Sequence, residues 1–231
     1  MMRLVNQTRL DFLLEFVQPR TILADIGTDH GYVPIKAVKD KQVVHAYGAD
    51  INLNPLNQAR KNVEKAGLSA EIDLIQTDGL TYFKEQNIEL DYVVISGLGA
   101  QSISKILVQD YLGINNYLIC ANTDPWPIRA QLQAKKLLIN QEFFLIDQEQ
   151  KYWFLWVSRT KGKKVISKSD FYLGVDEHLL SDQDYQEFLR LTIAKYKKLL
   201  PLVQSQEQKQ FYEFFINLVE KGEQDGSAKN N

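Results

Sequence analysis

The sequence of 231 residues predicts an α/β fold in which a mostly parallel sheet is followed by a helical hairpin. One observation is that short runs rich in Val, Ile, Leu or Tyr alternate with helix-length segments, which is typical of βαβ units. The other is that apolar residues late in the chain recur at the spacing of one helix face. The five predicted parallel strands are residues 21–25 (TILAD), 43–51 (VVHAYGADI), 70–75 (AEIDLI), 91–96 (DYVVIS) and 117–121 (YLICA).

Helix-length segments separate these strands, so the parallel sheet should be covered by helices on both faces. Residues 55–66 (PLNQARKNVEKA) are an example. Gly67 directly after them is typical of a helix C-cap, because glycine adopts the left-handed backbone conformation without strain.

Two further apolar runs, residues 142–147 (EFFLID) and 151–158 (KYWFLWVS), are separated by only a few polar residues. That gap is too short for a crossover helix, so the two runs should pair as an antiparallel hairpin. A parallel sheet closed by one such hairpin is uncommon among dinucleotide-binding folds and is expected of S-adenosylmethionine-dependent methyltransferases. We therefore predict a Rossmann-like, seven-stranded class I methyltransferase sheet.

The C-terminal part predicts two helices. Ser181 reads as an N-cap with the acidic Asp184 three residues on, which is a variant of the capping box. Pro201 should end or kink the first helix, and a second apolar face follows it. We expect a coiled-coil-like helical hairpin and divide the chain into a cofactor-binding methyltransferase domain, residues 1–165, and a helical domain, residues 166–231. The apolar positions are Tyr185, Phe188, Leu189, Tyr196, Leu199, Leu200 and Val203, then Phe211, Phe214, Phe215 and Leu218.

Composition limits the class of protein. The chain is 45% hydrophobic and 24% charged, which argues against disorder, and its net charge of −2 supplies no global field that would attract nucleic acid. The lone Cys120 permits neither an internal disulfide nor a cysteine zinc cluster, and we expect no metal site. Charged residues interrupt the N-terminus, and no apolar run approaches the ~20 residues of a membrane span. These features predict a soluble, cytoplasmic protein with no membrane partner.

The strongest local signal for a ligand is residues 24–31 (ADIGTDHG), at the end of the first predicted strand. Ligands of open α/β sheets bind at the carboxyl ends of strands, and a glycine there lets backbone N–H groups approach closely. The dinucleotide fingerprint G-x-G-x-x-G is absent, which disfavours NAD. Asp25 and Gly27 suit a zwitterionic amino-acid tail better than a pyrophosphate. The alternative is a turn that binds nothing.

Acidic residues also end the second and third strands. Asp50 could accept hydrogen bonds from both ribose hydroxyls of a nucleoside, and Asp78, followed by Gly79, could accept one from an exocyclic amino group. Each aspartate alone is more often a turn residue. Because they follow successive strands in order, together they favour a nucleoside site.

The last two parallel strands end in segments that suit a substrate. Residues 96–100 (SGLGA), with Gly97, leave room for a ligand. Asn122, Asp124 and Trp126 resemble the place where base-modifying methyltransferases hold a flipped base. The alternative is a proline-terminated loop with Trp126 packed in the core. Methylation of a ring nitrogen creates positive charge, which Asp29 or Asp124 could stabilise, with His30 as a possible helper.

Basic residues are clustered after the hairpin. Residues 159–168 (RTKGKKVISK) hold five basic residues and no acid. Such a run can neutralise phosphates and give salt-dependent affinity for RNA, although it is more often a solvated loop. For the aromatic-rich helical hairpin, packing against the rest of the protein is likewise the favoured interpretation, and a tRNA-binding arm is the alternative.

These motifs together resemble the bacterial TrmK family of tRNA methyltransferases, and the resemblance covers essentially the whole chain. The most specific part is residues 23–34 (LADIGTDHGYVP). Further matches are Thr8-Arg9-Leu10, Asp78-Gly79-Leu80, Ser96-Gly97-Leu98-Gly99, Asn122, Trp126, Arg129 and Leu173-Gly174. The resemblance implies methylation of N1 of the adenine at position 22 in tRNA, with S-adenosylmethionine as cofactor and tRNA as partner.

The resemblance also implies residue roles. Asn122 would face the target base, Asp29 and His30 would lie near the transferred methyl group, and Arg9 would reach either the methionine carboxylate or the RNA. The sequence departs from the family at residues 96–100, where AGMGG is usual, and at residues 120–122 (CAN), where QPN is usual. Our catalytic candidates are Asp29, Asn122 and Asp124, and our cofactor-binding candidates are Arg9, Asp25, Gly27, His30, Asp50, Asp78, Gly79 and Gly97.

Two rival functions remain open. One is methylation of another acceptor, either a different RNA base or a small molecule. The other is a non-catalytic module that binds S-adenosylmethionine or RNA. The sequence does not fix the oligomeric state, and a monomer is the simpler expectation.

Overall fold

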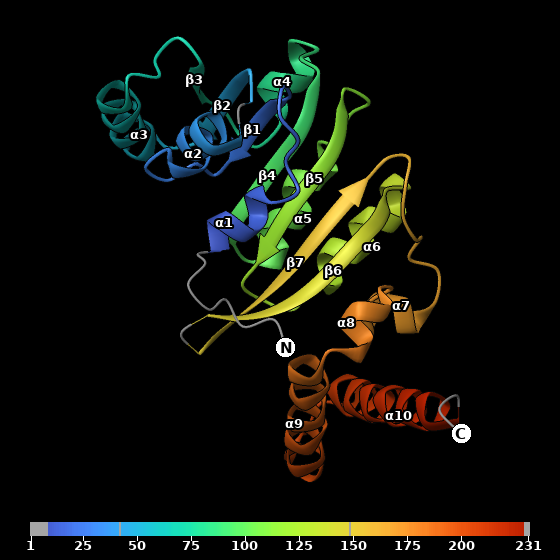
Figure 1. Cartoon of the computed structure of the whole chain (residues 1–231). Helices are drawn as coiled ribbons and strands as arrows, with labels where there is room; N and C mark the ends of the chain where they lie inside the picture. Colours follow the sequence, from blue (N-terminus) through green and yellow to red (C-terminus); the bar gives the residue numbers. More distant parts are fainter. Residues whose placement is uncertain (1–8, 42, 148, 229–231) are drawn as a thin grey trace.

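The computed structural model describes residues 9–41, 43–147 and 149–228, with side chains as far as residue 221. Thr8 of the family motif lies outside the described residues. The seven predicted strands form one sheet in the order β3-β2-β1-β4-β5-β7-β6, as Figure 1 shows. The first five strands are parallel, and β7 runs antiparallel to both β5 and β6. The strands are β1 (Ile22–Ile26), β2 (His45–Asp50), β3 (Ile72–Gln76), β4 (Leu90–Leu98), β5 (Ile114–Ala121), β6 (Leu138–Asp147) and β7 (Gln150–Ser158).

Helices connect the strands as the alternating pattern predicts. Helix α3 ends at Gly67, whose φ of 72° and backbone N–H bond to Val63 and Glu64 carbonyls make the predicted C-cap. The helices of this part are α1 (Arg9–Leu14), α2 (Tyr32–Lys41), α3 (Leu53–Ala66), α4 (Thr81–Glu85), α5 (Ala100–Val108) and α6 (Trp126–Lys135).

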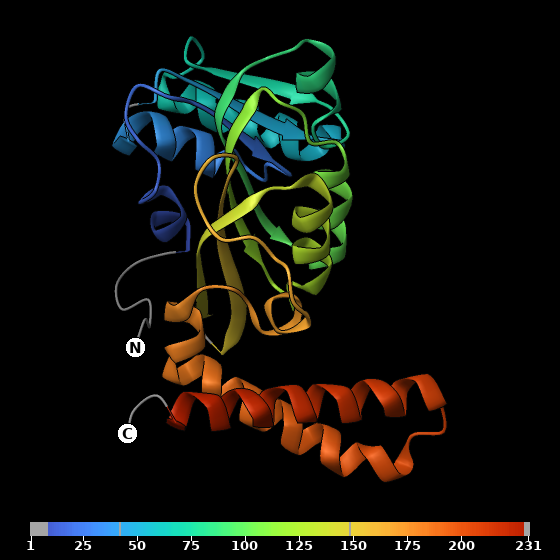
Figure 2. The same ribbon diagram turned by 90° about the vertical axis from the view of Figure 1, so that its right-hand side faces the viewer.

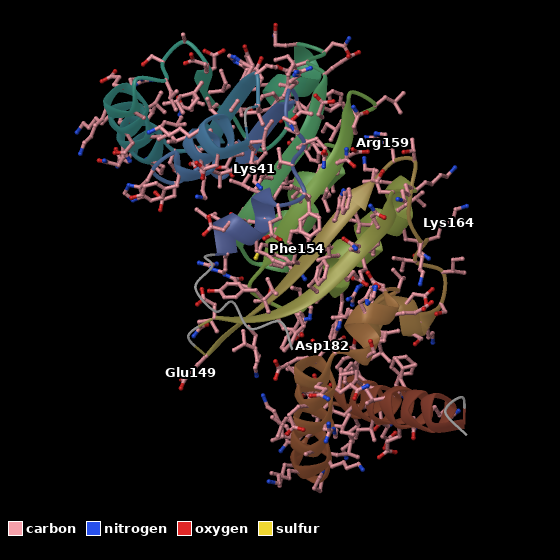
Figure 3. All side chains as sticks on the ribbon, in the orientation of Figure 1. Lys41, Glu149, Phe154, Arg159, Lys164 and Asp182 are labelled. Carbon is pink, nitrogen blue, oxygen red and sulfur yellow. The ribbon has the colours of Figure 1, made fainter. Side chains whose placement is uncertain are left out.

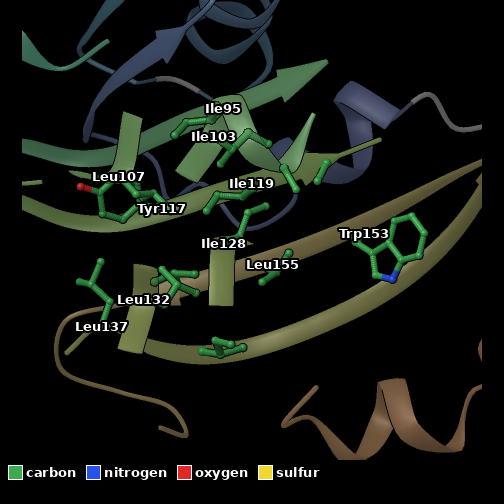
Figure 4. Close-up of a cluster of buried hydrophobic side chains, with 14 of the residues drawn as sticks. Ile95, Ile103, Leu107, Tyr117, Ile119, Ile128, Leu132, Leu137, Trp153 and Leu155 are labelled. Carbon is green, nitrogen blue, oxygen red and sulfur yellow. The ribbon is translucent and has the colours of Figure 1, made fainter. Parts of the chain in front are cut away.

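The sheet has a hydrophobic core on each face, which makes three layers (Figure 2). On one face, Phe12 and Leu13 of α1, Val33 of α2 and Val63 of α3 are buried against the sheet. On the other, α5 and α6 pack against β4 and β5. Figure 4 shows part of that core, including Ile95, Ile103, Leu107, Ile119, Ile128 and Leu132. Both faces of the parallel strands are therefore covered by helices and closed to solvent, so ligands must bind at the strand ends.

After the loop that follows β7, the described C-terminal segment consists of helices joined by short loops. The predicted N-cap is one residue off: Ser181 ends a short helix, and the side chain of Asp182 accepts the backbone N–H of Tyr185 at 2.8 Å. The first long helix ends before Pro201, as expected. The elements are α7 (Lys168–Leu173), α8 (Glu177–Ser181), α9 (Gln183–Leu199), η1 (Leu200–Leu202) and α10 (Gln206–Ala228).

Aromatic side chains join the C-terminal helices to the sheet. The ring of Phe144 on β6 lies 5.5 Å from that of Tyr185 and 5.3 Å from that of Phe188. The larger core continues through these contacts to Phe215 of α10. The division proposed between residues 165 and 166 falls in the loop between β7 and α7, and independence of the two parts stays a prediction.

Candidate functional site

The carboxyl end of β1 turns sharply over the end of β2. The backbone N–H groups of Gly27 and Thr28 both donate to the carbonyl of Ala49 at 2.8 Å. Gly27 has a φ of +80°, which strains any residue with a side chain, and a Cβ there would lie 3.4 Å from Leu98. The residue must therefore be glycine for the chain to leave the strand in this direction.

Asp25 at this turn is a buried carboxyl group with an unusual pKa. Its exposed fraction is 4%, and burial, with a smaller contribution from the charge of Asp50, raises its pKa to about 7 against the opposing effect of Thr28. Within the part of the chain that the structure describes, no cation contributes to this pKa, and only a side-chain hydrogen bond from Thr28 favours the charged carboxylate. A buried carboxyl group in this condition suits the ammonium group of an amino-acid tail.

The ends of β2 and β3 place two more acidic residues on the same edge. Asp50 accepts the backbone N–H of Asn52 at 2.7 Å, and its own carbonyl accepts from Thr77 at 3.0 Å, next to Asp78. Asp78 is exposed, and Gly79 after it has a φ of +57°. Ile51, beside Asp50, is 58% exposed and was not predicted as a site residue. Its position could have indicated one, because it is an apolar residue in a strand-end turn that is otherwise polar.

The loop between β1 and α2 carries Asp29 and His30. Their side chains are 74% and 42% exposed and approach each other to 3.3 Å. The ring of His30 stacks on that of Tyr32 at 5.4 Å, and the carbonyl of His30 accepts from Asn62 at 2.9 Å. A hydrogen bond to the loop backbone therefore fixes the loop, while the side chains of Asp29 and His30 remain accessible to solvent.

The ends of β4 and β5 leave an opening. A register shift between Ser96 and Leu98 bulges β4, and a Cβ at Gly97 would meet nothing within 4 Å. The hydroxyl of Thr123 accepts the backbone N–H of Ala100 at 2.9 Å. Asn122 is exposed and donates its own backbone N–H to Leu98 at 3.3 Å. The backbone at Gly97 thus borders open space, and Asn122 lies at the end of the neighbouring strand.

Trp126 and Asp124 face the helical hairpin. The ring of Trp126 lies 5.1 Å from Tyr172 and 5.3 Å from Phe211, which is the packing alternative raised by the sequence. Asp124 is half-buried, and burial raises its pKa while Arg129 and Lys151 oppose the rise. It stands between a pocket lined by Tyr185 and an open groove on the other side.

That groove lies between the β5–α6 loop and the tip of the β6–β7 hairpin. Its volume is about 330 Å³, and it is open to solvent on one side. Asn122 and Asp124 are site residues predicted from the sequence, whereas the hairpin residues of the groove were not predicted. The residues that line the groove are Asn122, Thr123, Asp124, Glu149, Gln150, Lys151 and Trp153.

Arg9 and Arg129 lie away from Asp25. Arg9 pairs with Asp147 at 3.5 Å and lies 4.1 Å above the ring of Tyr152, both on the hairpin. Arg129 is completely buried and donates to Glu142 at 2.8 Å, so its role in the fold is structural. Neither arginine contacts the end of β1 in the described contacts.

The basic run lies at the opposite end of the sheet from Asn122. Ser158 pairs with Asn116 and Trp153 with Ala121, so the chain leaves β7 at the amino end of β5. Figure 3 shows Arg159 and Lys164 far from Glu149 at the hairpin tip. Arg159 itself forms an ion pair with Asp110 at 2.5 Å, whereas Lys161, Lys163 and Lys164 are exposed.

The described residues contain no group of three or more His, Cys, Asp or Glu side chains that could hold a metal ion. Among them, no helix combines the length and apolarity that a membrane crossing requires.

Comparisons with known proteins agree with this geometry. A family model described as a methyltransferase domain matches residues 6–155. The chain is 36% identical over 99 residues to a tRNA (adenine(22)-N(1))-methyltransferase of Bacillus subtilis, a match that spans 43% of this chain and only 41% of that protein.

Two solved structures are similar over nearly the whole chain. TrmK of M. capricolum, in complex with S-adenosyl-homocysteine, is 32% identical with a TM-score of 0.86, covering 93% of this chain and 96% of that one. The B. subtilis m1A22 tRNA methyltransferase TrmK has a TM-score of 0.78 at 23% identity, covering 95% and 99% of the two chains, and so supports the fold.

Proposed function

Since the chain belongs to the TrmK family of methyltransferases, we propose that it transfers the methyl group of S-adenosylmethionine to N1 of the adenine at position 22 in tRNA. The observation that supports this most strongly is the arrangement along one sheet edge. A buried carboxyl without a described cationic partner, Asp25, and the open polar groove at Asn122 flank the bulge at Gly97. A cofactor and an acceptor bound at these two places would meet over the bulge.

The chain's residues suit the parts of the cofactor in order. Asp25 would accept the ammonium group of the methionine tail, and the glycine at 27 would let the backbone approach it. Asp50 would bind the ribose hydroxyls, and Asp78 with Gly79 would bind the adenine amino group. His30 and Gly97 would border the reactive end. S-adenosylmethionine itself supplies a methyl group already activated by a positively charged sulfur.

The chain then has to align the acceptor and stabilise charge. N1 of the adenine donates its lone pair to the methyl carbon, and the electron pair of the breaking carbon–sulfur bond stays on sulfur. The adenine ring gains a positive charge. We assign Asn122 to the amino edge of the base, and Asp29 and Asp124 to that charge, from the loops after β1 and β5.

The remaining assignments follow the same proposal. Arg9 lies at the hairpin with Asp147 and Tyr152, so we favour its RNA role over the methionine carboxylate. We also propose that the protein works in the cytoplasm, where tRNA is modified, and as a monomer, which light scattering would check.

The test is methyl transfer to two unmodified tRNA transcripts that differ only by A or G at position 22. Labelled methyl transfer, nucleoside digestion and mass spectrometry should give N1-methyladenosine from the first transcript alone. Label in another nucleoside, or in both transcripts, would indicate another acceptor. Cofactor binding in calorimetry with no transfer to any RNA would indicate a binding module.

A further inference from the structure

The β6–β7 hairpin extends past the end of the strand beside it. The last pair between β5 and β7 joins Ala121 to Trp153, yet β7 begins at Gln150. Lys151 and Tyr152 still pair with β6, so the overhang is regular sheet. At about 3.3 Å per residue, three residues project roughly 10 Å beyond β5. Figure 3 shows Glu149 at this projecting tip.

The overhang is held from both sides. On one side, Arg9 of α1 lies 4.1 Å above the ring of Tyr152 and 3.5 Å from Asp147. On the other, the ammonium of Lys151 lies 5.1 Å from the ring centre of Phe188 on α9. Contacts to two separate helices make the overhang a fixed wall beside Asn122.

The groove against this wall has polar groups that suit one nucleotide. It is open to solvent, and its volume is about 330 Å³. The loop side offers the Asn122 amide and the Asp124 carboxyl. The hairpin side offers the Glu149 carboxyl, the Gln150 amide and the Lys151 ammonium. Amides and carboxyls match base edges, and an ammonium matches a phosphate.

Lys151 brings positive charge to this groove. It is exposed, and its charge lowers the pKa of Asp124 against the effect of burial. The lysines of the basic run cannot substitute for it. They follow Ser158, five residues along β7 from Trp153, which is roughly 17 Å away at the spacing of a strand.

We infer that the β6–β7 hairpin is the outer wall of the site for the extruded target nucleotide, with Lys151 on a phosphate of that nucleotide and Gln150 on its base or ribose. This inference rests on the proposed function, because it takes the acceptor to be an RNA base. It assigns to the hairpin a part in RNA binding that is separate from cofactor binding.

The test replaces the charge and keeps a side chain of similar length. Lys151→Met keeps an unbranched side chain beside Phe188 but loses the cation, and Lys151→Arg retains the charge. The matched control is Lys65→Met, at the exposed end of α3. We expect Lys151→Met to weaken tRNA binding about tenfold and to reduce the slope of log affinity against log salt by roughly 0.7–0.9, the value of one phosphate contact. Lys151→Arg and Lys65→Met should bind tRNA as the unchanged protein does.

Cofactor affinity, measured by calorimetry, should be unchanged in all three variants. An unchanged tRNA affinity and salt slope in Lys151→Met would overturn the inference. Equal loss of tRNA and cofactor affinity would also overturn it, because the hairpin would then only support the fold. Failure of the proposed function is a separate result: the unchanged protein would make no N1-methyladenosine, whatever Lys151 does to RNA binding.

Discussion

The carboxyl group of Asp25 is buried where the described residues offer it no compensating cation. A residue in this position destabilises the empty protein, because the charged form has lost its water without gaining a partner. A positively charged ligand would remove the penalty. Binding and stability are therefore coupled at this one side chain.

This coupling predicts how stability depends on pH. The pKa of Asp25 is raised from 3.8 to about 7 in the folded state, so folding favours its protonated form. Its contribution to stability is complete below pH 3.8 and is lost as the pH rises to about 7. We expect Asp25→Asn to stabilise the cofactor-free protein at pH 8 by up to roughly 4 kcal/mol, since each unit of pKa difference is worth about 1.4 kcal/mol.

Denaturant unfolding at pH 5 and pH 8 measures this effect. The gain from Asp25→Asn should be much smaller at pH 5, and the variant should bind S-adenosylmethionine at least tenfold more weakly in calorimetry. Equal gains at the two pH values would show that Asp25 does not titrate in this range. Unchanged cofactor affinity would remove it from the site.

Asp29 differs from Asp25 because its side chain is 74% exposed. Asp29→Ala should therefore leave the melting temperature within about 2 °C of the unchanged protein, as surface substitutions usually do. If Asp29 stabilises the charge on the adenine, kcat should fall about tenfold or more with little change in cofactor affinity. Single-turnover methyl transfer checks this. A loss of stability in step with the loss of rate would make Asp29 structural.

At the scale of elements, α6 joins the candidate site to the C-terminal helices. It begins at Trp126, next to the groove, and its buried Arg129 donates to Glu142 of β6 at 2.8 Å. The other oxygen of Glu142 accepts the backbone N–H of Val175 at 2.8 Å, beyond α7. Three elements thus share one buried polar cluster that positions the start of α6.

Breaking this cluster should be costly. Arg129→Met leaves the charge of Glu142 buried and should destabilise the protein by about 3–5 kcal/mol, the usual cost of removing one partner of a buried pair. Adding Glu142→Gln should recover part of that loss, since the second change removes the unpaired charge. Denaturant midpoints of the single and double variants measure both effects. Strictly additive losses would mean that the two residues act independently.

At the scale of the whole molecule, the C-terminal helices complete a core that the sheet begins. Trp126, Phe144 and Trp153 pack against aromatic rings of α9 and α10. The described helices between residues 168 and 221 therefore cover apolar surface of the described part of residues 9–165, which distinguishes them from a tethered arm.

A fragment of residues 1–165 tests this arrangement. Without its helical cover it should melt at least about 10 °C below the full chain or bind a hydrophobic dye, because buried aromatic surface becomes exposed. Thermal melts of the fragment and the full chain make the comparison. A fragment as stable as the full chain would show two independent domains.

The sequence by itself determined the seven strands, the helices between the parallel strands, the two long C-terminal helices and the strand ends at which the acidic residues lie. These elements can be predicted because their signals involve residues close together in the sequence. The signals are the strand and helix periodicities, Gly67 as a helix C-cap, and the short gap before residue 151 that requires a hairpin. Asp25, Asp50 and Asp78 lie along one edge of the sheet because they are at the carboxyl ends of neighbouring parallel strands.

Only the tertiary structure decided which neighbour each side chain meets. Trp126 packs on Phe211 across 85 positions, Arg9 pairs with Asp147, and the basic run lies at the far end of the sheet. The overhang of the hairpin depends on the register between β5 and β7, and the pKa of Asp25 depends on burial by residues from other strands. A sequence period records which face is buried, whereas register and long-range packing fix what covers it.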